Sequence, residues 1–225
     1  MIGTVGGVLL SAPVFILFGD PLAEGGLALG LLVVAQPIAY LLTALGLVAA
    51  VHPRSLRLLR GVRSPRGRHA LGGVGLGVGG FVLSNVVVAS AAVWLLQQAG
   101  LDLPPVQETF EAAAADATAL PYLVIGAVLL APIAEELVFR GVLYPALARR
   151  VPRGAAMWLS AAVFAVVHGA GADALGNVLL MLIILPFGVL LAWGYERTGT
   201  LLVPVAAHVV FNAISVSQLA LTAQA

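Results

Sequence analysis

Long apolar segments, separated by short charged or Gly/Pro-rich breaks, make up most of the chain. We predict a helix from each segment, because each is close to the roughly 20 residues that an α-helix needs to cross a hydrocarbon core about 30 Å thick. The predicted spans lie near residues 2–19, 26–51, 70–98, 118–147, 153–170, 174–195 and 199–220. The pattern therefore predicts an all-α fold, a polytopic transmembrane helical bundle of about seven spans.

The composition favours a membrane environment for these helices. Hydrophobic residues make up 61% of the 225 residues and charged residues only 9%, whereas soluble domains carry about 25% charged residues. The chain has no cysteine, which excludes disulfides, thiolate metal sites and cysteine nucleophiles. No basic face or aromatic platform remains once the apolar segments are placed in a bilayer, so we expect lipid around the chain and no nucleic-acid partner.

Arginine positions predict the orientation. All 11 cationic side chains are arginines, and all but one of them lie in three loops on the same side of a seven-span bundle. The loop arginines are Arg54, Arg57, Arg60, Arg63, Arg66, Arg68, Arg149, Arg150, Arg153 and Arg197. The positive-inside rule makes that side cytoplasmic, so we expect the N-terminus inside and the C-terminus outside.

The first apolar run and the segment before the fourth span support further predictions. The first apolar run lacks a basic start and an A-x-A cleavage site, so we expect a retained span rather than a cleaved signal peptide. Leu101–Ala117, with its acids and alanine run, predicts a short external interfacial helix.

In the third span, the spacings Gly73/Gly77 and Gly75/Gly79 predict a close helix-packing face. A G-x-G-x-x-G match there follows no strand, which argues against a dinucleotide site.

Three charged residues lie within the apolar spans: Glu135, Glu136 and Arg140. Each costs about 2.5–3.5 kcal/mol at the centre of a membrane helix on insertion scales, so each needs a partner or a function. Glu136 and Arg140 are four positions apart and can pair on one helix face. Glu135 is rotated by about 100° from Glu136. We therefore predict a structural role for Glu136 and assign Glu135 to other chemistry.

Three polar side chains on other spans lie at a depth similar to that of Glu135. Counted from the nearest cytoplasmic arginine on the same helix, Glu135, His168 and Asn212 are each 15 positions away, and His208 is one turn shallower. If the helices are unbroken, all lie roughly 16–22 Å from that face at a rise of about 1.5 Å per residue. Taken alone, each residue is at least as typical of a structural hydrogen bond between helices as of a catalytic role. Taken together, the residues predict a reaction site.

Three short motifs occur in order on separate spans: Glu135-Glu136-Leu137-Val138-Phe139-Arg140-Gly141, Phe164-Ala-Val-Val-His168 and His208-Val-Val-Phe-Asn212. They match the E-E-x-x-x-R, F-x-x-x-H and H-x-x-x-N motifs of the CPBP family of intramembrane proteases, relatives of the type II CAAX prenyl endopeptidases. The chain resembles this family over about residues 118–215. We therefore divide it into N-terminal transmembrane helices with a basic cytoplasmic loop (1–117) and a CPBP-like catalytic transmembrane core (118–225).

The resemblance implies an intramembrane endopeptidase that hydrolyses peptide bonds of a membrane-associated protein or peptide. In the family, the glutamate matching Glu135 is taken to activate a water, aided by the histidine matching His168. The residues matching His208 and Asn212 are taken to stabilise the oxyanion, and an imidazole and an amide are suitable donors for that task. The predicted catalytic set is Glu135, Glu136, Arg140, His168, His208 and Asn212.

Members of the family are often labelled metalloproteases, and the candidate zinc ligands here are Glu135, His168 and His208. No H-E-x-x-H motif is present. Using Glu135 as a ligand would leave only Glu136 as a base, and the arginine is expected to hold that residue. We favour a metal-free glutamate mechanism with no cofactor, and zinc stays open as the alternative.

Two alternatives from other functional classes stay open. Intramembrane Glu, His and Arg also form proton relays, so the chain could be a transporter or proton conductor, although it shows no internal repeat of the kind typical of transporters. It could also be a non-catalytic membrane scaffold. The all-arginine, Ala/Gly/Val-rich composition with short loops is typical of a GC-rich prokaryotic genome. We therefore expect a multi-pass protein of a prokaryotic plasma membrane, without prenylated substrates.

Overall fold

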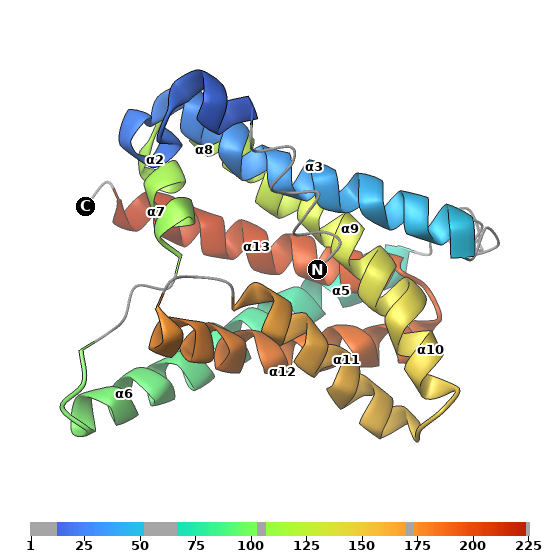
Figure 1. Cartoon of the computed structure of the whole chain (residues 1–225). Helices are drawn as coiled ribbons and strands as arrows, with labels where there is room; N and C mark the ends of the chain where they lie inside the picture. The colour runs from blue at the N-terminus through green and yellow to red at the C-terminus, as the bar shows by residue number, and fades with distance from the viewer. Residues whose placement is uncertain (1–12, 52–66, 103–106, 170–172, 224–225) are drawn as a thin grey trace. The chain divides into compact units, whose positions relative to one another are not determined.

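The structure is a computed structural model that describes residues 13–51, 67–102, 107–169 and 173–223. Every regular element within these ranges is helical (Figure 1), which confirms the predicted all-α class. Among the described residues, five helices are long and apolar enough to cross a membrane: Gly26–Ala50, His69–Gln98, Leu120–Ala148, Ala174–Thr198 and Leu202–Thr222. The chain is an integral membrane protein.

Two of the seven predicted spans need separate comment. The span predicted at 153–170 corresponds to α11 (Arg153–His168), whose 16 residues extend about 24 Å and fall short of a hydrocarbon core about 30 Å thick. Most of the span predicted at 2–19 lies outside the described residues, as does the basic loop. The total of seven spans and the orientation therefore stay predictions.

The chain divides into two compact units. Unit 1 comprises Met1–Val62, Glu108–Val138 and His208–Ala225, and unit 2 comprises Arg63–Gln107 and Phe139–Ala207. The earlier division at residue 117 stays a prediction.

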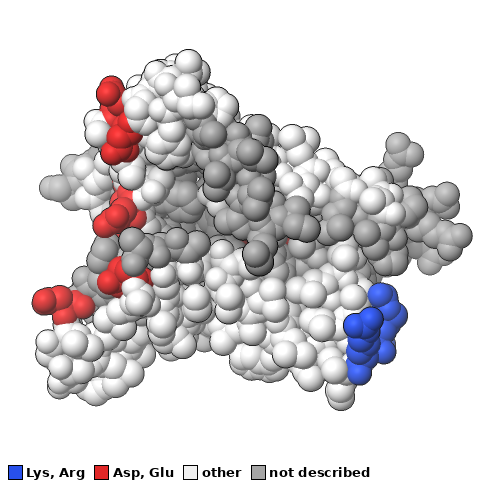
Figure 2. All heavy atoms as spheres, in the orientation of Figure 1, with Lys and Arg blue, Asp and Glu red and all other residues white. Residues whose placement is uncertain are grey.

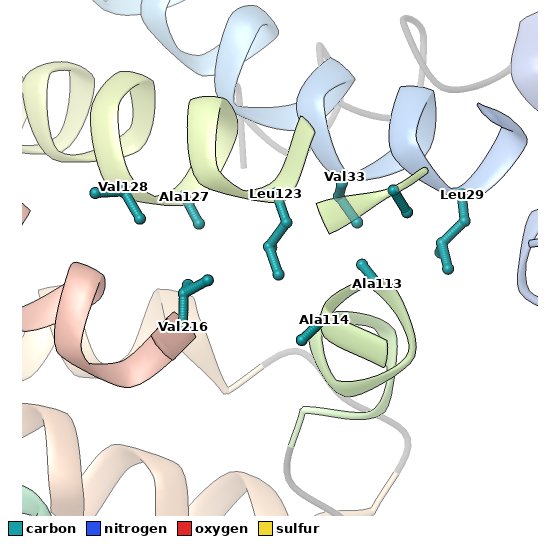
Figure 3. Close-up of a cluster of buried hydrophobic side chains, with 9 residues drawn as sticks. Leu29, Val33, Ala113, Ala114, Leu123, Ala127, Val128 and Val216 are labelled. Atoms are coloured by element: carbon teal, nitrogen blue, oxygen red, sulfur yellow. The ribbon is translucent and has the colours of Figure 1, made fainter. Parts of the chain in front are cut away.

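Unit 1 is built from small side chains that allow its helices to pack closely. Its elements are α2 (Pro21–Glu24), α3 (Gly26–Val51), α7 (Glu108–Ala115), α8 (Leu120–Leu123), η2 (Val124–Leu130), α9 (Ala131–Val138) and the part of α13 (Leu202–Thr222) from residue 208. Figure 3 shows buried side chains of α3, α7, the α8–η2 segment and α13 pointing toward one another. A Cβ on Gly126 would lie 3.0 Å from the Val33 carbonyl oxygen, so a glycine lets η2 approach the α3 backbone.

The helix predicted within Leu101–Ala117 is present as α7. Its alanine face is buried in the cluster of Figure 3, because Ala113 and Ala114 pack against α3 and α8. Asp116 follows α7 and joins two helix starts. Its Oδ2 accepts the Gly26 N–H at 2.7 Å, and its Oδ1 accepts the N–H groups of Thr118 and Ala119.

Unit 2 is organised around α12 (Ala174–Thr198), which packs against α11, α5 (Gly67–Phe81) and η1 (Val82–Ala89). Its other elements are α6 (Ser90–Gln98), η3 (Phe139–Leu143), α10 (Tyr144–Ala148) and the first residues of α13. Positively charged side chains gather near the turn between α10 and α11 (Figure 2). At this end Glu196 links three helices, because one oxygen accepts the Tyr144 hydroxyl at 2.6 Å and the other pairs with Arg153 at 2.9 Å.

The predicted glycine-packing face in α5 is confirmed at Gly73. A Cβ on Gly73 would lie 2.7 Å from the Ala206 Cβ, so this glycine allows α5 to approach α13. Within the described ranges nothing lies within 4 Å of the position of a Cβ on Gly75 or Gly79, so packing at these two glycines stays a prediction. The face of α5 that packs is therefore set by Gly73 and by Gly80, which lies against Phe187.

Candidate functional site

The helix that carries the two motif glutamates is interrupted by π-helical turns. Pro132 follows η2, and Pro145 follows η3. A proline in a helix lacks an N–H and its ring clashes with the carbonyl four residues earlier, here Val128 and Gly141. The wider π turn relieves this crowding, and such turns inside α-helices are frequent at functional sites.

The π turn before α9 explains the position of Asn212. The Ala131 N–H bonds to the Gly126 carbonyl, in the π pattern. The next carbonyl, that of Ala127, would be paired in this pattern with the N–H of residue 132, but Pro132 has none. The Asn212 side-chain amide donates to this carbonyl at 2.7 Å. Asn212 therefore fixes α13 to η2 through a backbone group that the helix itself leaves unpaired.

His208, one turn before Asn212 on α13, lies between the two motif glutamates. Its Nδ1 is 2.9 Å from Glu136 Oε1, and its Nε2 is 3.8 Å from Glu135 Oε2. Because an ionised carboxylate only accepts hydrogen bonds, Nδ1 is the donor in the first contact. The second separation is too long for a direct hydrogen bond. His208 is only 4% exposed and Glu136 is fully buried, whereas the Glu135 side chain is 15% exposed.

Arg140 is held in unit 2 by a carbonyl and an aromatic ring. Its Nη2 donates to the Gly188 carbonyl at 2.9 Å, and its guanidinium lies 4.5 Å from the centroid of the Phe164 ring. Phe164 also meets Phe139 edge-on at 5.0 Å. A Cβ on Gly188 would lie 3.1 Å from the Ala161 Cβ, so the glycine permits the close approach of α12 and α11. The fully buried arginine is therefore positioned by the first residue of the F-x-x-x-H motif.

His168 ends α11 in a fixed ring orientation. Its Nδ1 lies 2.7 Å from the Phe164 carbonyl oxygen, and its ring packs 4.6 Å from the Phe164 ring. A carbonyl only accepts, so Nδ1 carries a hydrogen, and in a neutral ring the lone pair would lie on Nε2. The four-residue spacing of this motif thus lets Phe164 orient both the histidine and the arginine.

The predicted site residues fall into two sets. Glu135, Glu136, His208 and Asn212 belong to unit 1, and Arg140 and His168 belong to unit 2. The contact of Glu136 with His208 was missed by the sequence analysis, which assigned Glu136 to Arg140 from local spacing. The predicted pair of Glu136 with Arg140 and the predicted common depth of the site residues both involve residues of the two units. Both stay predictions.

Two further contributors to the site had no clear signal in the sequence. Gly188 is one of many glycines in the spans, and only the fold reveals that its carbonyl accepts from Arg140. The Ala127 carbonyl is a backbone group, and its need for a partner follows from the π turn and Pro132 together. The proline was visible in the sequence; the π register was not.

The residues of unit 1 supply too few donors for a catalytic zinc site on their own. Such a site takes three protein ligands, and Glu136 Oε1 is already 2.9 Å from His208. Glu135 and His208 remain as candidates in unit 1, and His168 belongs to unit 2. Across the part of the chain that the structure describes, no group of three or more His, Cys, Asp or Glu is arranged to hold a metal ion.

Comparisons with known proteins address this region directly. Neither the comparison with curated proteins nor the comparison with solved structures found a match. A family model does match, and the matched segment contains all three motifs. Over residues 117–214 the chain matches the family described as Type II CAAX prenyl endopeptidase Rce1-like, which confirms the family resemblance predicted from the motifs.

Proposed function

We propose that the protein is an intramembrane endopeptidase that uses Glu135 to activate a water for hydrolysis of a peptide bond. The family match supports the class of activity. The observation that carries the mechanism is the position of His208, with Nδ1 on Glu136 and Nε2 toward Glu135. This arrangement resembles the carboxylate–imidazole unit that orients histidine in other hydrolases.

In the proposed reaction, Glu135 acts as general base. A water that hydrogen-bonds to Glu135 Oε2 attacks the carbonyl carbon of the scissile bond, and the carboxylate accepts its proton. The C–N bond then breaks, and the same proton passes from Glu135 to the departing amine. One water is consumed, and the products are a carboxylic acid, which keeps the second proton of the water, and an amine.

His208 and Asn212 are proposed to stabilise the oxyanion of the tetrahedral intermediate. For Nε2 of His208 to donate, the ring must carry protons on both nitrogens, and the Glu136 carboxylate compensates that charge. Asn212 already donates one amide hydrogen to Ala127, so its second amide hydrogen is the one proposed for the oxyanion. Removing one donor from such a site typically lowers kcat by about 10²–10³.

His168 and Arg140 complete the proposal from unit 2. With Nδ1–H on the Phe164 carbonyl, His168 offers the Nε2 lone pair as a second acceptor for protons of the water. Arg140 holds its place through Gly188 and Phe164, and its proposed role is to position the motif glutamates. The substrate is a membrane-associated protein or peptide, and the proposed location is a prokaryotic plasma membrane.

The test is cleavage of a peptide library reconstituted in membranes with the purified protein. We expect the wild type to generate products one water heavier in total than the substrate, Glu135→Ala to generate none, and Glu111→Ala to match the wild type. Glu111 is a suitable control because it is an exposed acid on α7. Equal cleavage by the wild type and Glu135→Ala would contradict the proposal.

A further inference from the structure

A pocket of about 430 Å³ opens in unit 2, and none of the residues of the proposed reaction lines it. It lies where the starts of α5 and α13 meet the end of α12, and glycines bring these helices together. A Cβ on Gly194 would lie 2.8 Å from Leu76 Cδ2, and one on Gly73 would lie 2.8 Å from the Val203 carbonyl oxygen. The walls of the pocket are therefore set by close backbone packing.

The lining of the pocket is polar on one part and apolar on another. The polar side chains are His69, Arg197 and Thr198, and the large apolar ones are Leu76, Trp193 and Val203. The guanidinium of Arg197 lies 5.4 Å from the centroid of the Trp193 ring. The Thr198 hydroxyl donates to the Gly194 carbonyl, so the donors available to a ligand come from Arg197 and His69.

We propose that this pocket binds the phosphate headgroup of an anionic phospholipid. A guanidinium and an imidazole N–H match phosphate oxygens in charge and hydrogen-bonding capacity. The apolar wall fits the first part of an acyl chain, and a tryptophan beside an arginine is typical of the level of the headgroups. The pocket belongs to the helix ends that the arginine pattern assigns to the cytoplasmic face, where anionic lipids are concentrated.

Gly72 and Gly75 give a way to fill the pocket without disturbing its walls. Both line it, and among the residues that the structure describes nothing lies within 4 Å of the position that a Cβ would take on either glycine. Gly79 is equally open and lies on the same helix, but it does not line the pocket. Gly75→Leu and Gly79→Leu therefore form a matched pair of test and control.

The experiment uses Trp193 as the reporter. The other tryptophans, Trp94 and Trp158, are 58% and 57% exposed, so both can be replaced by phenylalanine. The full-length protein is reconstituted in vesicles that contain phosphatidylglycerol or phosphatidylcholine with brominated acyl chains. We expect brominated phosphatidylglycerol to quench Trp193 fluorescence several-fold more effectively than brominated phosphatidylcholine.

Variants then assign this preference to the pocket. Arg197→Gln should reduce it about fivefold, the effect of one basic residue at an anionic surface, and Gly75→Leu should abolish it, whereas Gly79→Leu should keep it. Equal quenching by the two lipids, or a preference that survives both Arg197→Gln and Gly75→Leu, would overturn the proposal. Loss of the preference on addition of inorganic phosphate at low millimolar concentration would also overturn it, because the occupant would then be a soluble anion.

Discussion

At the residue scale, the proposed site in unit 1 centres on the contact between Glu136 and His208. Local spacing pairs Glu136 with Arg140, but the fold also brings it within 2.9 Å of His208 on a distant part of the chain. A fully buried carboxylate with an imidazole partner both compensates charge and fixes the ring. The contact supports a role for Glu136 in orienting His208, in addition to the structural role predicted from its spacing to Arg140.

The first prediction is that Glu136→Gln loses stability as well as activity. The amide oxygen can still accept from Nδ1, but the charge that compensates a protonated His208 is gone. Breaking a buried charge pair costs on the order of 3–5 kcal/mol, so we expect a large decrease in the unfolding free energy in detergent or bilayer. Glu111→Gln serves as the control. A Glu136→Gln variant as stable and as active as this control would contradict the proposed role of Glu136.

At the element scale, the π turn of η2 and the amide of Asn212 depend on each other. Pro132 creates a carbonyl without a helical partner, and Asn212 supplies the missing donor. We expect Asn212→Ala to cost about 1–3 kcal/mol, the typical penalty for leaving a buried polar group unpaired. This structural cost accompanies any loss of oxyanion stabilisation.

A double-mutant cycle separates the two effects. Pro132→Ala restores an N–H at the position that the π pattern pairs with the Ala127 carbonyl, so the second substitution should recover part of the stability lost in Asn212→Ala. Turnover should not recover, because the restored N–H points to the carbonyl and not to the substrate. Unfolding free energies of the four proteins test the coupling. Additive effects of the two substitutions would show that Asn212 and Pro132 act independently.

The backbone hydrogen bonds that Asp116 accepts give a prediction for the pH dependence of stability. Hydrogen bonds from the backbone N–H groups of Gly26, Ala119 and Thr118 lower the pKa of the Asp116 carboxyl from its usual value. The folded state therefore favours the carboxylate, and the contribution to stability is fully present above the unfolded pKa of about 3.9 and is lost as the pH falls below it. The difference in Tm between wild type and Asp116→Asn should be constant near neutral pH and shrink below about pH 4. A difference that grows on acidification would contradict this assignment.

At the scale of the whole molecule, the apolar pattern predicted the helical class and most helix positions, because both depend on the length of hydrophobic runs. It gave no warning of the π turns in the helix of Glu135, although Pro132 and Pro145 were visible. It also missed the contact of Glu136 with His208, since local spacing says nothing about contacts between distant segments. The helix predicted near residues 153–170 is present as α11, which ends at His168.

The arginine pattern makes a prediction for the whole chain that stands apart from the site. We expect reporter fusions at Arg63 and after Ala225 to report opposite sides of the membrane, with Arg63 cytoplasmic, because the positive-inside rule places the arginine-bearing loops inside. A fusion series that alternates the reporter between both sides at each loop checks the number of spans. Both fusions on one side would contradict the predicted topology, because an even number of spans would then have to separate Arg63 from the C-terminus.

The central claim is that Glu135 activates the water, and the most direct measurement is kcat of Glu135→Gln on a peptide that the wild type cleaves. The amide is nearly isosteric with the carboxylate but cannot accept the proton, so we expect turnover to fall by about 10²–10⁴. The Tm should stay within a few degrees of the wild type, because Glu135 is the partly exposed member of the glutamate pair. Retention of wild-type kcat by a folded Glu135→Gln protein would contradict the account.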